Sequence, residues 1–87
     1  MYVILCYDVA KERTRKAMKV CRQYLCPVQR SVFEGNITPA RLERLKAELA
    51  AVLEPEEDAV VIYRLDSARQ AARDQIGKQS RVPDGFL

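Results

Sequence analysis

The chain has no histidine among its 87 residues. Imidazole acid–base catalysis, Ser/His and Cys/His nucleophiles and histidine-ligated zinc are therefore excluded within one copy of the chain. Its cysteines, Cys6, Cys21 and Cys26, are odd in number and form no C-x-x-C motif, which excludes a zinc ribbon or a thioredoxin-like site. We expect three reduced, largely buried thiols in a reducing cytosol.

Long apolar runs are also missing. No uncharged run exceeds seven residues, whereas a membrane span needs about 20. The chain has only three glycines and four prolines and is 48% hydrophobic, which argues against disorder. We expect a mature, soluble, cytoplasmic protein without membrane association. It should form a single domain over residues 1–87, with its core in 1–65 and a C-terminal extension, related to dimer formation, in 66–87.

The charge is distributed unevenly. The net charge is only +3, from 15 basic and 12 acidic residues. Residues 1–53 carry ten basic and five acidic side chains, whereas residues 54–87 carry five and seven. Six basic residues and one acidic residue fall within Lys11–Arg22. Such a local cluster of positive charge can bind a polyanion, although the positive and negative charges of the whole chain nearly cancel.

Hydrophobic periodicity predicts an alternation of strands and helices. The expected strands are apolar runs, the first of them central and covered on both sides. The expected helices have an apolar stripe, and Thr38-Pro39 starts the second one as N-cap and first helical residue. The expected strands are Tyr2–Tyr7, Val28–Glu34 and Ala59–Leu65, and the expected helices are Glu12–Leu25 and Pro39–Leu53.

Beyond Leu65 the pattern is weaker: we expect a short helical turn over Ser67–Arg73 and a short strand over Asp74–Gly77. The whole order predicts an α+β, ferredoxin-like sandwich, with two helices on one face of an antiparallel sheet. One feature resists this fold. The second and third strands should form a hairpin, yet Val28–Glu34 contains no recognisable turn, and the first turn signal is Gly35-Asn36. Either one long bent strand takes that place or the tail supplies the partner strand.

Asp8 is the most prominent polar residue, because it ends a buried strand. It either caps the following helix or serves chemistry. Mg²⁺ is commonly held by one or two carboxylates together with phosphate oxygens and water. A two-fold homodimer would bring two copies of Asp8 to its axis. Without histidine, the base must be a carboxylate or a metal-bound hydroxide. We therefore hypothesise a Mg²⁺ ion, or another divalent cation, shared across the dimer by catalytic Asp8.

The first helix carries a cationic outer face, which is either a solvated surface or a contact for nucleic-acid phosphates. Arginines beside a metal-binding carboxylate suit a phosphodiester substrate, because the metal ion and the guanidinium groups together neutralise the negative charge of the phosphate backbone. Few aromatic residues lie among these cations, so recognition should favour the backbone and shape of RNA or duplex DNA over base sequence. The residues assigned to nucleic-acid binding are Arg13, Arg15, Lys16, Lys19 and Arg30.

Three separated blocks in this order resemble the small CRISPR-associated adaptation protein, the second of the two core proteins of spacer acquisition in this antiviral defence. They are Met1–Val9, Val28–Gly35 and Ala59–Leu65, of which V-Q-R-S-V-F-E-G is the most diagnostic. The resemblance implies a ferredoxin-like homodimer that joins the larger CRISPR adaptation integrase. It also implies a metal-dependent endoribonuclease, some members acting on double-stranded DNA.

The resemblance assigns the metal to Asp8 and matches Arg13 and Arg15 to arginines early in the first helix. It gives supporting places to Tyr7, Ser31 and Phe33. Many members have an arginine where this chain has Pro27; Arg30 substitutes for it, or that phosphate contact is absent. Family tails pair with the partner subunit, an arrangement that Gln75-Ile76-Gly77 suits.

Two other functions fit parts of the sequence. A non-catalytic dimeric scaffold would hold duplex DNA and bridge integrase subunits, with Asp8 vestigial. A ferredoxin-like small-ligand or regulatory domain would need a compact apolar pocket with a few polar groups, of which the sequence shows no sign.

Overall fold

The computed structural model describes residues 1–67 and 70–77. These residues form five strands, two α-helices and one short 3₁₀ helix. In chain order these are β1 (Tyr2–Asp8), η1 (Lys11–Arg13), α1 (Thr14–Arg22), β2 (Cys26–Gln29), β3 (Val32–Asn36), α2 (Pro39–Val52), β4 (Ala59–Ser67) and β5 (Gln70–Gly77).

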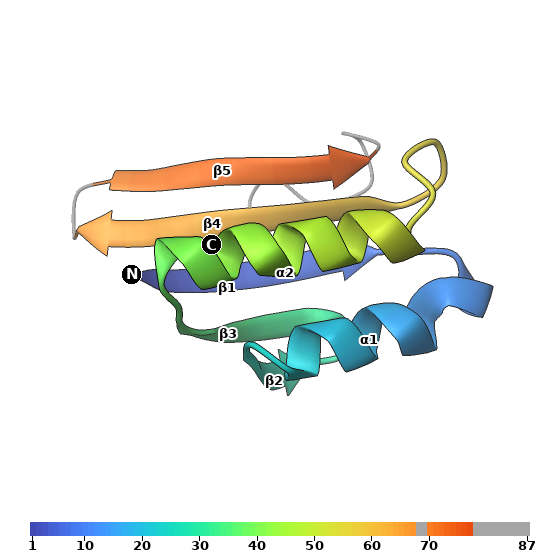
Figure 1. Ribbon diagram of the computed structural model, residues 1–87, viewed down its shortest axis with the longest axis horizontal. Helices are drawn as coiled ribbons and strands as arrows, with labels where there is room; N and C mark the ends of the chain where they lie inside the picture. Colours follow the sequence, from blue (N-terminus) through green and yellow to red (C-terminus); the bar gives the residue numbers. More distant parts are fainter. Residues whose placement is uncertain (68–69, 78–87) are drawn as a thin grey trace.

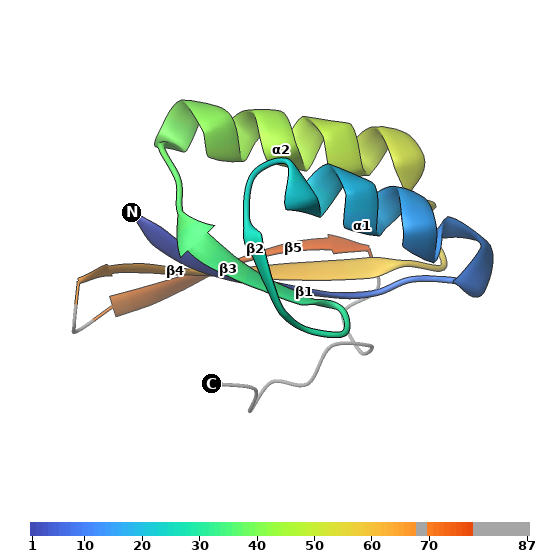
Figure 2. The same ribbon diagram turned by 90° about the horizontal axis from the view of Figure 1, so that it is seen from below.

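The strands form one sheet in the order β2-β3-β1-β4-β5, in which every neighbouring pair is antiparallel. Both helices lie on the same face of this sheet (Figures 1 and 2). The first four strands and two helices make the ferredoxin-like arrangement, and β5 extends the sheet at the β4 edge. The predicted α+β sandwich is confirmed.

Strand β1 is the centre of the sheet and has apolar side chains on both faces. Val3, Leu5 and Tyr7 belong to the large core beneath the helices. Ile4 and Cys6 belong to a second apolar cluster. Because successive side chains of a strand point to opposite faces, this second cluster lies on the other side of the sheet, which we call the helix-free face.

The second helix matches its prediction closely. The Thr38 hydroxyl accepts a hydrogen bond from the Arg41 backbone N–H, and Pro39 occupies the first turn. Leu42, Leu45 and Leu49 are buried against the sheet. The first helix differs from its prediction, because Lys11–Arg13 form a 3₁₀ turn before the α-helix, which ends at Arg22 instead of Leu25.

The single strand expected over Val28–Glu34 is wrong. A hairpin joins β2 and β3, and its loop is Arg30-Ser31, between the paired residues Gln29 and Val32. Ser31 adopts a left-handed conformation with φ of 68°, which reverses the chain without glycine. The expected turn at Gly35-Asn36 is also wrong, since both residues continue β3.

The C-terminal segment also departs from its prediction. The expected helical turn over Ser67–Arg73 is wrong, because Gln70–Arg73 lie in β5, which is longer than the expected Asp74–Gly77. The Gln75–Gly77 segment pairs with β4 of the same chain, opposite Val61, Val60 and Ala59. The expected pairing of this segment with a partner subunit stays a prediction, since β5 is the outer strand of the sheet described here. The sequence also predicts that the two apolar residues Phe86 and Leu87 dock onto their own domain or onto a partner subunit, and both lie outside the described residues.

We expect Ser31→Gly to leave the free energy of unfolding within about 1 kcal/mol of the wild type. Glycine adopts positive φ without strain, and this gain offsets its greater entropy in the unfolded chain. Ser31→Val should instead lose about 1–2 kcal/mol, because a β-branched residue fits the left-handed region poorly. Denaturant unfolding of both variants measures the difference. Equal losses in the two variants would show that the backbone conformation of Ser31 does not limit its replacement.

Candidate functional site

Asp8 ends β1 and is paired in register with Ala59 at the start of β4. Its side chain is half-buried. The alternation along β1 places Tyr7 under the helices and Asp8 on the helix-free face. The sheet therefore presents this carboxylate away from both helices.

The apolar residues of the helix-free face come from three strands. Cys6, Val32, Ala59, Val61 and Tyr63 form a buried cluster, with Ile4 packed against it. Both helices lie on the other side of the sheet (Figure 2). The five clustered side chains are at most 7% exposed in the single chain, and Asp8 lies at the end of the same face.

Tyr7, Phe33 and Ser31 gather on the opposite, helix-covered face. The rings of Tyr7 and Phe33 stack with centroids 6.1 Å apart and an interplanar angle of 23°. The Tyr7 backbone N–H donates to the Ser31 carbonyl over 3.0 Å, which ties the hairpin to β1. Burial raises the pKa of Tyr7, although a hydrogen bond with the Ser31 side chain opposes that shift. Tyr7 is therefore a neutral hydroxyl at physiological pH.

The predicted nucleic-acid-binding residues are divided between the helix and the hairpin. Arg15, Lys16 and Lys19 are exposed on α1, and Arg30 is exposed in the β2–β3 loop. Since α1 covers the face opposite Asp8, the structure does not bring the cations of this helix beside that carboxylate. The sequence predicted that Arg13 and Arg15 lie near the same end of the sheet as Asp8, because they follow it closely in the chain, and it did not predict that the sheet lies between α1 and the face of Asp8.

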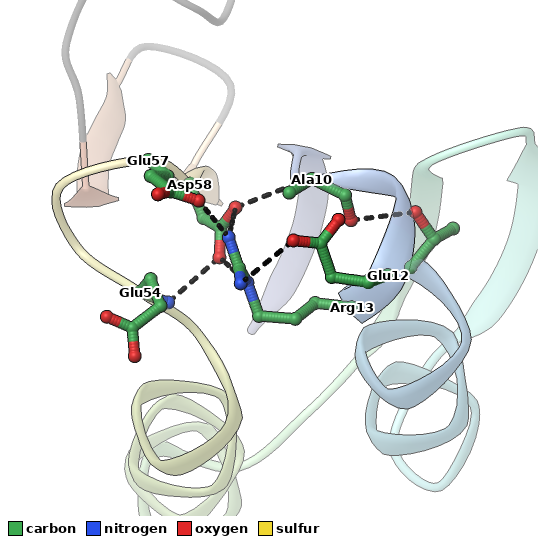
Figure 3. A network of polar contacts seen from close by, with 7 residues as sticks. Ala10, Glu12, Arg13, Glu54, Glu57 and Asp58 are labelled. Carbon is green, nitrogen blue, oxygen red and sulfur yellow. Dashed lines mark hydrogen bonds and ion pairs between the residues drawn. The ribbon is translucent and has the colours of Figure 1, made fainter.

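Arg13 is committed to an ion-pair network instead of an open surface (Figure 3). Its Nε donates to Asp58 Oδ2 over 2.6 Å, and its Nη2 donates to Glu57 Oε1 over 2.7 Å. Glu12 lies 3.6 Å from Nη1. Carboxylates therefore surround the guanidinium, which fixes the turn after β1 against the loop before β4. The sequence predicted that Arg13 contacts nucleic acid, whereas in the structure its guanidinium binds carboxylates of the same chain. The contact with nucleic acid stays a prediction.

Asp58 is the residue that the sequence analysis missed. Its side chain is fully buried, and it also accepts from the backbone N–H groups of Ala10 and Glu54, both over 2.8 Å. Burial alone would raise the pKa of Asp58, but the hydrogen bonds from Arg13, Glu54 and Ala10 outweigh it and lower the pKa from 3.8 to about 2. Asp58 thereby holds the Val9-Ala10 segment, which follows Asp8.

A cavity of about 520 Å³ opens on the helix-covered face, between the end of β1, the start of α1 and the hairpin loop. Buried Tyr7 and Phe33 lie at its floor, and exposed Lys11 and Arg30 line it too. The sequence had shown no sign of an apolar pocket with a few polar groups, so this expectation is corrected. The remaining lining residues are Val9, Thr14, Met18 and Ser31.

The described residues of one chain hold no cluster of three or more metal-ligating His, Cys, Asp or Glu side chains. Cys6 and Cys21 are buried as expected, whereas Cys26 is exposed, which corrects the prediction for that residue. Burial raises the pKa of Cys21 to about 12, so this thiol stays protonated. Within the described ranges no helix is long and apolar enough to cross a membrane.

Comparison with known proteins decides the family. The model of the family described as CRISPR associated protein Cas2 matches residues 1–73. The chain belongs to the CRISPR-associated protein Cas2 family. A protein of Thermotoga maritima named CRISPR-associated endoribonuclease Cas2 is 39% identical over 87 residues, which cover 100% of this chain and 99% of that protein.

Two further Cas2 proteins support the assignment. A protein of the same name from Thermococcus kodakarensis is 49% identical over 67 residues, covering 77% of this chain and 79% of the relative. The crystal structure of Streptococcus pyogenes Cas2 at pH 6.5 superposes with a TM-score of 0.69 and 35% identity, covering 75% of this chain and 86% of that one. The resemblance read from three sequence blocks is thereby confirmed, and so is the fold that it implied.

Proposed function

We propose that this chain is a CRISPR-associated endoribonuclease that acts in spacer acquisition, where it works as a homodimer beside the CRISPR adaptation integrase. Membership of the Cas2 family supports this function, because its relatives carry that name. The observation that carries the mechanism is the position of Asp8, at the end of the central strand on the helix-free face. One copy supplies one such carboxylate, and a two-fold dimer packed through this face supplies two.

The donor set of two such aspartates fits a hard divalent cation. Mg²⁺ needs only one or two protein carboxylates, since water and phosphate oxygens complete its six ligands. Asp8 from each copy would hold the ion, which when bound supplies Lewis-acid activation of a phosphodiester. The protein's own part is to fix both carboxylates on rigid strands and to hold the following Val9-Ala10 turn through Asp58.

Nucleic-acid binding by the exposed cations of α1 supports a second function. Arg15, Lys16 and Lys19 lie on the side of the sheet away from Asp8, so they can contact a phosphate backbone without any metal at Asp8. This separation favours a scaffold role, in which the dimer holds duplex DNA and bridges integrase subunits. Such a role does not exclude cleavage, because the two surfaces are distinct.

The dimer interface can be tested through Ile4, which is half-buried on the helix-free face. We expect Ile4→Glu to lower the mass in solution from twice to once the chain mass of 10.0 kDa, because a carboxylate there would be desolvated in the interface. Val28→Glu is the matched control, since Val28 is 49% exposed on the edge strand β2. Light scattering after gel filtration measures both. A wild type that is already monomeric would refute the shared site.

Cleavage of single-stranded RNA and of duplex DNA by the wild type, in Mg²⁺ and in EDTA, tests the enzymatic proposal. We expect cutting of RNA in Mg²⁺ that EDTA abolishes. Stable binding of duplex DNA without cutting of either substrate across a range of pH would instead establish the scaffold role.

A further inference from the structure

The cavity on the helix-covered face does not hold the carboxylate on which the function proposed above depends, although Tyr7, Phe33, Ser31 and Arg30, which the sequence analysis gave to that function, line it. Asp8 is not among the described residues that line the cavity, and the alternation of side chains along β1 assigns it to the helix-free face. The volume of the cavity, about 520 Å³, falls within the range of about 300–1,000 Å³ that is usual for small-molecule sites. It is therefore a second candidate site with its own chemistry.

The apolar part of the cavity suits a flat ring. Its floor is the stacked pair of Tyr7 and Phe33, which are only 6% and 2% exposed. Val9 and Met18 are half-buried at its sides. Aromatic and thioether groups make favourable contacts with a planar π-system, and any of the nucleobases has such a face.

The polar part suits an anion. Lys11 from η1 and Arg30 from the hairpin loop are both exposed and both line the cavity. Thr14 and Ser31 add hydroxyl groups, and no acidic side chain is present among the described lining residues. A guanidinium and an ammonium beside hydroxyl donors are the groups that bind phosphate in proteins.

We propose that this cavity binds a nucleotide, with the base against Met18 and Val9 and the phosphate between Lys11 and Arg30. The ligand is either a free nucleoside monophosphate or the unpaired 5′-terminal nucleotide of a strand, since both present the same base and phosphate. Binding here requires no divalent cation and no second copy of the chain. Nucleotide binding in the cavity and cleavage at Asp8 can therefore be tested separately, and failure of one does not refute the other.

The chain's two methionines make a direct test possible. Met18 lines this cavity, whereas Met1 lines a separate one beside the start of α2. In protein labelled with carbon-13 at the methionine methyls, AMP titrated in EDTA should shift the Met18 signal to saturation and leave Met1 unmoved. Inorganic phosphate and adenosine, which each lack half of the ligand, should bind at least about tenfold more weakly than AMP.

Variants of the two cations test the phosphate contact. Lys11→Ala and Arg30→Ala should each weaken AMP about tenfold, by loss of a charge-assisted hydrogen bond. Arg44→Ala is the matched control, because Arg44 is an exposed cation of α2 outside the lining. The Met1 signal reports whether each variant is folded. A 5′-phosphorylated tri-adenylate then distinguishes the sources: saturable binding supports a strand end, and its absence beside AMP binding supports a free nucleotide.

Several results would overturn the proposal. They are a Met18 methyl that does not respond to millimolar AMP, a Met1 methyl that responds equally, and an Arg44→Ala loss as large as that of Arg30→Ala. Phosphate binding as tight as AMP would refute the base contact, and adenosine binding as tight as AMP would refute the phosphate contact.

Discussion

Asp8→Asn should reduce Mg²⁺-dependent RNA cleavage by about a hundred- to a thousandfold while leaving the fold intact. The amide keeps the size of the side chain but removes the negative charge that a divalent cation requires. In a dimer that shares one ion, a single substitution in the gene removes both carboxylates. The effect should therefore be larger than that of losing one of two ligands. Initial rates of cleavage at saturating Mg²⁺ measure it, and circular dichroism confirms the fold.

The matched control is Glu56→Gln, which removes an exposed carboxylate from the turn between α2 and β4. It should leave the cleavage rate unchanged. Undiminished cleavage by purified Asp8→Asn protein would rule out the metal site. The cations of α1 and the scaffold role would remain as the function of the chain.

Asp58→Ala should destabilise the protein by about 3 kcal/mol, because it removes one partner of a buried ion pair and leaves Arg13 and two backbone N–H groups without their acceptor. We take the lower end of the usual range, since the Arg13 side chain is 16% exposed and water reaches it. For a domain of this size the midpoint temperature should fall by about 15 °C. Thermal and urea unfolding give the two numbers.

Glu57→Ala provides the comparison within the same network. Glu57 binds Arg13 over 2.7 Å, but its side chain is 62% exposed. A surface ion pair contributes at most about 1 kcal/mol, so the loss should be small. Equal losses for Asp58→Ala and Glu57→Ala would show that burial of Asp58 does not determine its contribution.

The same carboxylate makes stability depend on pH in a defined direction. Because the folded pKa of Asp58 is lowered from 3.8 to about 2, its contribution is fully present above pH 4 and is lost as the pH falls toward 2. Urea unfolding between pH 6 and pH 2 should therefore show a steeper acid decline in the wild type than in Asp58→Ala. Parallel pH profiles would contradict this assignment.

The sequence predicted those elements whose local signals agree with their tertiary surroundings. Strand β1 is apolar on both faces, and α2 has a cap, a first-turn proline and a leucine stripe, so both were found almost to the residue. The β2–β3 hairpin was missed because Arg30-Ser31 contains no glycine, proline, asparagine or aspartate, and serine alone is a weak turn signal. Ser31 holds its positive φ through tertiary contacts, such as the hydrogen bond to Tyr7, and no local propensity reports them.

The site was predicted in part for a related reason. Asp8 was recognised because it follows an apolar strand. Asp58 ends a run of acidic residues of the kind typical of a solvated turn, and its partner Arg13 lies 45 residues earlier in the chain, so no local pattern marks it. Arg13 in turn counted as one of several cations on a helix. Only the folded structure shows that the Asp58 side chain is fully buried and that Arg13 is mostly buried beside it.

The alternation of side chains along β1 has one more consequence. A single peptide bond separates Tyr7 from Asp8, yet the whole thickness of the sheet lies between the surfaces to which they belong. A polymer that touches both surfaces of one copy has to pass around an edge or an end of the sheet, and the hairpin at the β2 edge carries the exposed Arg30.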